Sequence, residues 1–490
     1  MAQFEIKDGV AFILDGTTEI GGSAFYNCSS LTSVTIPESV TEIGYSAFRD
    51  CTSLESITIP KSVTVIGERA FNDCTALKNV TIPESVTRIA ENAFYGCSEL
   101  ESVVIPNSVT EIGKNTFRAC FSLKSITIPE SVTKIGALAF NLCTSLESIV
   151  IPESVTKIDE GAFSSCKSLK SITIPESVKA IGEGAFGCCT SLKSITIPGS
   201  VGTIRYEAFA RCTSLEDVVM SKGVKKIGYE AFKGCTSLKS ISVPVSVKEI
   251  DDHAFDGCTS LESIVLPKVK KIGHSAFYGC TSLESVRIVD SATEISPCAF
   301  RECISLKSIT IPNSVTKIAM EAFGGCTSLE SVAIPESVTD IAFEVFPGCT
   351  SLESVVVAEG NPKYDSREGC NAIIETATNI LVAGCKTTVI PNSVTVIGRY
   401  AFADCTSLES ITIPESVTMI EWGAFSRCTS LKSVTILGSA TVIDKSAFSD
   451  SMALDTINVP IGMTDYYKKR LPEELHDKIV ELAPEKKTKK

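Results

Sequence analysis

The sequence predicts a mainly β solenoid, in which short parallel strands stack along a curved rod. Two observations carry this prediction: one pattern of residues recurs every 23 residues, and each copy contains the apolar spacing L-x-x-L-x-L followed by a proline. The segment from Leu54 to Cys74 shows the pattern, and the pattern returns at Leu77, Leu100 and Leu123. A period of this length indicates repeats that bury their apolar faces against one another, rather than several globular domains.

The first part of each repeat predicts a short strand. Leu54, Ile57 and Ile59 turn inward, whereas Ser56 and Thr58 point outward, because side chains alternate along a strand. The proline that follows ends the strand, since it has no N–H to donate.

The second part of each repeat predicts the opposite wall and the filling of the coil. Val63 and Ile66 form a second inward pair, which we interpret as another short strand, and Gly67 favours a tight corner. Ala70 and Phe71 fill the centre, and a cysteine closes the repeat.

The phenylalanine of the A-F pair marks 18 repeats. These residues are Phe25, Phe48, Phe71, Phe94, Phe117, Phe140, Phe163, Phe186, Phe209, Phe232, Phe255, Phe277, Phe300, Phe323, Phe346, Phe402, Phe425 and Phe448. The step from Phe346 to Phe402 is much longer than the others. It predicts an insertion in the solenoid.

These markers divide the chain into three parts. We expect an N-terminal cap at residues 1–17, a solenoid at 18–459 and a C-terminal helical cap with a charged tail at 460–490. The inserted hairpin falls at about 358–390.

Seventeen of the 21 cysteines occupy one position of the repeat. Side chains stacked in one column point the same way, which disfavours disulfide geometry, and a buried thiol behaves as a small apolar residue. We therefore expect reduced packing residues; some disulfides, or a metal site, are the alternatives. No pair of C-x-x-C motifs supports zinc.

Both ends depart from the repeat, as capping requires. The segment Phe4 to Leu14 predicts a hairpin that turns at Asp8-Gly9. At the other end, four apolar residues at helical spacing predict one helical stripe that covers the last coil. They are Leu471, Leu475, Ile479 and Leu482. We expect the charged tail, Glu485 to Lys490, to be a solvated end.

Two cysteines lie outside the column, in the inserted hairpin. A turn at Thr376 to Asn379 places Ile374 opposite Leu381 and Ile373 opposite Val382. The same register places Cys370 opposite Cys385, which makes this pair the disulfide candidate in an oxidising compartment.

Composition and motifs exclude several functions. The formal charge of -13 disfavours nucleic acid as a partner, because such proteins need a basic surface. We expect no membrane insertion, because no apolar segment is long enough to span a membrane. With three histidines and no phosphate-binding or hydrolase motif, we expect neither an enzyme nor a cofactor.

The most divergent repeats supply candidate ligand-binding residues. Lysine replaces the usual threonine in three successive repeats, at Lys225, Lys248 and Lys270. Beside them, one predicted column holds Tyr206, Tyr229, Asp252 and His274. Such a basic stripe beside aromatic residues could bind a sulfated glycan or an acidic protein segment. Alternatively, these lysines are splayed and solvated near acidic neighbours.

A third column alternates in charge. The residues after the repeat leucine are Glu55, Lys78, Glu101, Lys124, Glu147 and Lys170. We expect their charged groups to meet across neighbouring coils, because opposite charges on adjacent strands attract.

The repeat C-T-S-L-x-S-I-T-I-P-x-S-V-T-x-I-G-x-x-A-F resembles the BspA-like leucine-rich repeat family. The resemblance covers about Thr18 to Val459. It implies a leucine-rich repeat solenoid and an adhesin-like surface or secreted module that recognises host proteins or glycans. An intracellular protein-interaction scaffold is the alternative. A leader peptide would favour the surface location, and a true start at Met1 would favour the cytoplasm.

Overall fold

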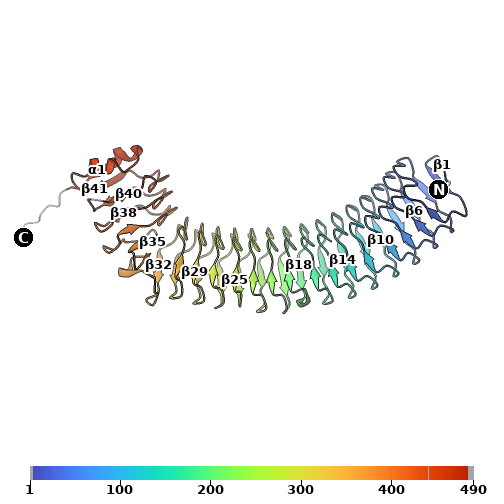
Figure 1. Ribbon diagram of the computed structural model, residues 1–490, viewed down its shortest axis with the longest axis horizontal. Helices are drawn as coiled ribbons and strands as arrows, with labels where there is room; N and C mark the ends of the chain where they lie inside the picture. The colour runs from blue at the N-terminus through green and yellow to red at the C-terminus, as the bar shows by residue number, and fades with distance from the viewer. Residues whose placement is uncertain (1–3, 440, 484–490) are drawn as a thin grey trace, which may run out of the picture. The chain divides into compact units, whose positions relative to one another are not determined.

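The structure is a computed structural model that describes residues 4–439 and 441–483. The chain divides into two compact units, Met1–Thr259 and Ser260–Lys490. In each unit, short strands from successive coils follow one another in parallel (Figure 1). The predicted mainly β solenoid is confirmed.

One coil shows why the repeat folds in this way. Strand β6 (Ser56–Thr58) buries Ile57 and exposes the residues on both sides of it. The N–H of Val63 then donates to the carbonyl of Pro60 over 3.1 Å and closes a turn. Strand β7 (Val65–Ile66) buries Ile66 on the opposite wall. Both predicted walls are therefore present.

In the first unit, the strands of each wall pair in register with those one repeat away. Ile57 lies beside Val34 on one side and Val80 on the other. The first wall contains β4 (Ser33–Thr35), β6, β8 (Asn79–Thr81), β10 (Ser102–Val104), β12 (Ser125–Thr127), β14 (Ser148–Val150), β16 (Ser171–Thr173), β18 (Ser194–Ile197), β20 (Asp217–Met220) and β22 (Ser240–Ser242). The second wall contains β3 (Glu19–Ile20), β5 (Glu42–Ile43), β7, β9 (Arg88–Ile89), β11 (Glu111–Ile112), β13 (Lys134–Ile135), β15 (Lys157–Ile158), β17 (Ala180–Ile181), β19 (Thr203–Ile204), β21 (Lys226–Ile227) and β23 (Glu249–Ile250), with one 3-10 turn, η1 (Gly199–Val201).

The phenylalanines stack through the core. The rings of Phe48 and Phe71 lie 5.3 Å apart and almost parallel, at 1°. Phe117 and Phe140 repeat the arrangement at 5.6 Å and 7°. Because each of these rings is fully buried, every coil depends on its neighbours for its packing.

The cysteines form a second buried column, of thiols. The Sγ of Cys74 donates to the carbonyl of Phe48 over 3.0 Å, and Cys166 makes the same bond to Phe140 over 3.2 Å. In the last coil, the Oγ of Ser451 keeps this bond, to the Phe425 carbonyl at 2.7 Å. As predicted, the cysteines of this column are buried thiols, except for Cys28 and Cys405, which are half-buried.

The turn after the second wall requires left-handed backbone at two positions. In one coil these are Arg69, with φ 57°, and Asp73, with φ 56°. Asn92 holds the first position in the next coil, as suits a conformation that asparagine tolerates. Leu138 and Leu142 adopt it in another coil with φ 56° and 64°, at a steric cost.

The corner glycine has a different role from the predicted one. Gly67 does not have a positive φ. A Cβ added there would lie 2.7 Å from the carbonyl carbon of Gly44 and 2.8 Å from the oxygen of Ile43. Glycine is favoured here because backbones of successive coils approach closely.

The second unit repeats both walls. The first wall contains β24 (Ser263–Leu266), β26 (Ser285–Ile288), β28 (Ser308–Thr310), β30 (Ser331–Ile334), β32 (Ser354–Val357), β37 (Ser410–Ile413), β39 (Ser433–Ile436), β41 (Thr456–Val459) and β42 (Ile479–Glu481). The second wall contains β25 (Lys271–Ile272), β27 (Glu294–Ile295), β29 (Lys317–Ile318), β31 (Asp340–Ile341), β36 (Val396–Ile397), β38 (Met419–Ile420) and β40 (Val442–Ile443).

The insertion replaces part of a coil. Strand β33 (Tyr364–Asp365) pairs antiparallel with β34 (Ala372–Glu375), a 3-10 turn, η2 (Arg367–Gly369), lies between them, and β34 pairs antiparallel with β35 (Ile380–Gly384). Strand β35 then pairs in parallel with β36. The hairpin thereby continues the second wall.

The N-terminal hairpin is confirmed. Strands β1 (Phe4–Lys7) and β2 (Val10–Ile13) are antiparallel, and Lys7 pairs with Val10 across a turn whose two residues both have positive φ. Strand β2 continues in parallel onto β4.

The predicted C-terminal helical stripe is wrong beyond Lys478. Helix α1 (Thr464–Lys468) and the 3-10 turn η3 (Glu473–Lys478) are short, and the chain then forms β42, which pairs in parallel with β41. The reason is the open edge of β41, whose unpaired backbone groups are better satisfied by a strand than by a helix. The predicted tail, Glu485 to Lys490, lies outside the described residues.

Candidate binding surface

The outward face of the first wall is flat. Ser56 and Thr58 are both exposed, and the same two positions are exposed on strands β10, β12, β14 and β16 of this wall. Valine replaces threonine at Val104 and Val150, where it is 65% and 78% exposed. Since the core lies beneath this face, these side chains can vary without disturbing the fold.

The predicted charge-alternating column is present on this wall, and the charged groups of two of its neighbouring pairs meet. The N–H of Lys124 donates to the carbonyl of Glu101 over 3.1 Å, and their charged groups meet at 2.9 Å. Lys170 and Glu147 meet at 2.7 Å. Hydrogen bonds from these lysines lower the pKa of both carboxyls. Each of these lysines therefore has a carboxylate partner within the protein.

Two of the predicted lysines are neighbours in the first unit. The N–H of Lys248 donates to the carbonyl of Lys225 over 2.8 Å. The Nζ of Lys248 donates to a neutral acceptor, the carbonyl of Val245, over 2.8 Å. Lys226, next to this pair, is instead held by Asp251 at 2.7 Å and Glu249 at 3.2 Å. Hydrogen bonding to Asp251 raises the pKa of Lys226.

The two predicted tyrosines also meet. Tyr206 and Tyr229 are 43% and 40% exposed, and their rings stack 5.6 Å apart. Asp252 follows Tyr229 at the equivalent position of the next coil, and the ring of His253 beside it contacts Tyr229 edge-on at 5.8 Å. The side chain of Glu207 raises the pKa of Tyr206, and the charge of Glu230 raises that of Tyr229.

Lys270 and His274 belong to the second unit, in which both are exposed. The residues that the structure brings together are therefore Lys225 with Lys248, and Tyr206 with Tyr229.

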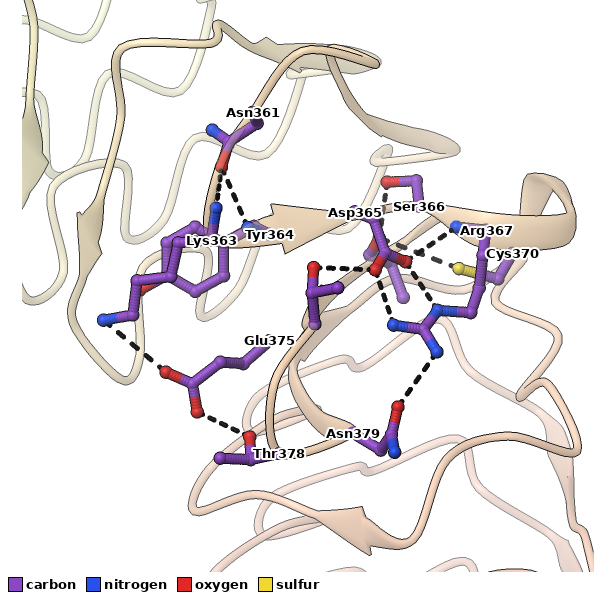
Figure 2. A network of polar contacts seen from close by, with 12 residues as sticks. Asn361, Lys363, Tyr364, Asp365, Ser366, Arg367, Cys370, Glu375, Thr378 and Asn379 are labelled. Carbon is purple, nitrogen blue, oxygen red and sulfur yellow. Dashed lines mark hydrogen bonds and ion pairs between the residues drawn. The ribbon is translucent and has the colours of Figure 1, made fainter.

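A polar network anchors the inserted hairpin (Figure 2). Arg367 donates to both carboxylate oxygens of Asp365, at 2.7 and 2.5 Å, and to the side chain of Asn379 at 2.9 Å. Thr376 also donates to Asp365, at 2.9 Å. Burial opposes ionisation of Asp365, but these hydrogen bonds lower its pKa. The network ties the strand before the hairpin to its turn.

The predicted hairpin register is only partly right. Ile374 pairs with Leu381 as predicted, but a bulge follows, and Ile373 pairs with Ala383 instead of Val382. The extra residue enters on β35, so the strands beyond the bulge are displaced by one position.

The bulge also affects the disulfide candidate. The Sγ of Cys385 donates to the carbonyl of Asn371 at 3.4 Å, and the Sγ of Cys370 donates to the carbonyl of Ala372 at 3.7 Å. Both side chains are buried thiols. The register that aligned Cys370 with Cys385 therefore does not hold.

Comparison with known proteins decides the family. A family profile described as "BspA type Leucine rich repeat region (6 copies)" matches residues 18–147, 133–262, 248–367 and 382–471. The chain belongs to the BspA-type leucine-rich repeat family. The repeats of this family are non-catalytic binding modules, and leucine-rich repeat proteins bind protein partners.

One solved structure agrees with this fold. A leucine-rich repeat protein from Bacteroides ovatus is 26% identical, with a TM-score of 0.60 over 99% of this chain and 98% of that chain. A leucine rich cell surface protein from Faecalibacterium prausnitzii is 26% identical, with a TM-score of 0.34 over 95% of each chain. No curated protein sequence shows significant similarity to the chain. Within the described parts of this BspA-type chain, no helix is long and apolar enough to cross a membrane.

The sequence analysis missed one group of exposed aromatic residues in the second unit. Phe343 and Trp422 are 47% and 52% exposed, and both contact Tyr400. Each departs from the polar residues common at its repeat position, but the insertion separates Phe343 from the other two in the sequence.

Proposed function

We propose that this chain is a non-enzymatic, adhesin-like solenoid that binds an acidic macromolecule of the host, for which a sulfated glycan is the simplest representative. Lys225 and Lys248 would contact its anionic groups, and the exposed rings of Tyr206 and Tyr229 would pack against it. The family supports the general binding role, because its repeats are binding modules.

The adjacency of Lys225 and Lys248 carries this proposal. Like charges in neighbouring coils are unfavourable, and threonine occupies the same position in other repeats, for example Thr64 and Thr87. Lys225 is exposed and Lys248 is half-buried, and neither side chain belongs to the apolar core. A partner with closely spaced negative charges would relieve the repulsion.

The test compares two charge-matched variants on immobilised heparin. Lys225→Thr with Lys248→Thr restores the usual residue and should weaken binding at least tenfold while stability stays equal or rises. Lys124→Thr with Lys170→Thr removes the same amount of charge from the charge-alternating column, and this variant should retain binding. Affinity of the wild type should fall as salt is raised.

Two results would contradict the proposal. Equal loss in both variants would mean attraction by overall charge, and no loss in either would remove these lysines from any binding site. Protease treatment of intact source cells tests the location, since an adhesin is cleaved from outside and an intracellular scaffold is protected.

A further inference from the structure

We infer that Phe343, Tyr400 and Trp422, with the acidic groove beside them, form a docking site for an arginine- or lysine-bearing segment of a partner protein. This inference goes beyond the proposed function, because the site lies wholly in the second unit and prefers the opposite charge. We call these residues and the groove the aromatic site.

The three rings form one exposed surface. The ring centroids of Phe343 and Tyr400 are 5.9 Å apart, and those of Tyr400 and Trp422 are 4.9 Å apart at an angle of 63°. Phe343 and Trp422 are each about half exposed. Aromatic side chains and arginine are enriched at the energetic centres of protein interfaces.

Tyr400 is held there against its backbone preference. Its φ of 54° lies in the left-handed region, where glycine and asparagine are favoured and a bulky residue is uncommon. Its ring covers Gly423, at which an added Cβ would lie 2.6 Å from the tyrosine Cε1. Tyr400 is therefore a half-buried ring that lies between the exposed rings of Phe343 and Trp422.

A charged groove lies next to the rings. It has a volume of about 380 Å³. Gly324, Gly325 and Gly348, which have no side chains, form part of its lining. Its charged lining residues are Glu302, Glu321, Glu344, Asp404, Arg301 and Arg427. Four carboxylates therefore face two guanidinium groups.

The two arginines are already engaged within the protein. Arg427 donates to both oxygens of Asp404, at 2.7 and 2.6 Å, and lies 3.6 Å from Glu344. Arg301 pairs with Glu321. Burial, together with the charge of Asp404, raises the pKa of Glu344. Its carboxylate would gain from a further cation.

Charge complementarity selects the occupant. A guanidinium or ammonium group gains most from an aromatic face when it also meets a carboxylate. Phe343 and Tyr400 supply the faces nearest the groove, and Glu344, the residue after Phe343, supplies the negative charge beside them. A neutral sugar could stack on the rings but would leave the excess negative charge uncompensated.

The experiment uses the full chain and its single tryptophan, Trp422, as reporter. Tetra-arginine amide is titrated while the tryptophan emission is followed; tetraglutamate and maltohexaose are the comparison probes. We expect a saturable change with tetra-arginine that weakens as salt is raised, and none with the other two. Because Trp422 reports only its own surroundings, failure of the lysine site in the first unit would leave this result unchanged.

Three variants test which residues are responsible. Glu344→Gln should weaken tetra-arginine binding at least fivefold, whereas Glu284→Gln, a matched change at an exposed carboxylate paired with Lys307, should not. Tyr400→Asn should weaken binding while the thermal midpoint stays equal or rises, since asparagine tolerates the left-handed backbone. A saturable response to maltohexaose alone, or equal losses in both glutamate variants, would overturn the inference.

Discussion

Raising the pH from 8 to 10 should unfold the first unit, because its cysteine column cannot ionise in place. Burial raises the pKa of eight fully buried thiols along this column. They are Cys74, Cys97, Cys120, Cys143, Cys166, Cys189, Cys212 and Cys235. Near the N-terminal end of the column, burial raises the pKa of Cys51 to about 12.

The size of the effect follows from proton binding. The unfolded chain loses its thiol protons near pH 9.0, whereas the folded chain keeps them. The stability contribution is therefore complete below pH 9 and is lost as the pH rises towards the folded pKa. At pH 10 each such thiol costs about 1.4 kcal/mol of unfolding free energy. Eight thiols cost about 11 kcal/mol, which is comparable to the whole stability of a typical domain.

Urea unfolding followed by circular dichroism, with reductant present throughout, measures this loss at pH 7, 8, 9 and 10. The midpoint should be nearly constant between pH 7 and 8 and fall steeply above pH 9. Native protein at pH 8 should also react slowly with a chromogenic thiol reagent, since a raised pKa leaves far less of the reactive thiolate. Denatured protein should expose most of its thiols.

A double variant separates the thiols from lysine and tyrosine, which titrate at similar pH. Cys143→Ser with Cys166→Ser should retain the column hydrogen bonds, as Ser451 does. Its loss between pH 8 and 10 should be smaller than that of the wild type by about 3 kcal/mol, twice the single-thiol value. A midpoint that is equal at pH 8 and 10, or a variant as pH-sensitive as the wild type, would refute the reasoning.

Three further changes test the backbone and the insertion. Leu142→Asn should raise the urea midpoint, by up to about 1 kcal/mol, because asparagine adopts positive φ more readily than leucine; an unchanged or lower midpoint would mean that lost packing outweighs the backbone relief. Gly182→Ala should destabilise the chain by about 1–3 kcal/mol, since an added Cβ would collide with the backbone of Glu160 in the preceding coil; calorimetry showing no loss would contradict the close approach. Arg367→Ala should cost about 1.5–3 kcal/mol in the insertion and raise the pKa of Asp365; amide exchange of the hairpin and titration of the carboxyl by NMR measure both effects.

Most of the fold could be predicted because the same apolar, glycine and cysteine positions recur in successive repeats. Ile57 and Phe71 recur at positions that only an inward orientation explains, and the cysteine at the end of each repeat follows from the same pattern. Asp8-Gly9 and the turn after Glu375 are local features, so neighbouring residues suffice to predict them.

Features that depend on what an element packs against could not be predicted in this way. A bulge places Ala383 opposite Ile373, where Val382 was predicted. No residue type in the hairpin indicates that a bulge forms there. Ile479 keeps helical spacing with Leu475 but pairs as a strand, because the open edge of β41 is available.

The sequence by itself determined the solenoid, its two walls and its buried columns, because a periodic apolar pattern permits only one inward face. Tertiary structure alone decided which exposed residues meet. Phe343 and Tyr400 stand on either side of a long insertion, yet the hairpin packs into the second wall and leaves the flanking coils in contact. The contact between these rings is therefore set by how the insertion packs against the coils, and not by their spacing along the chain.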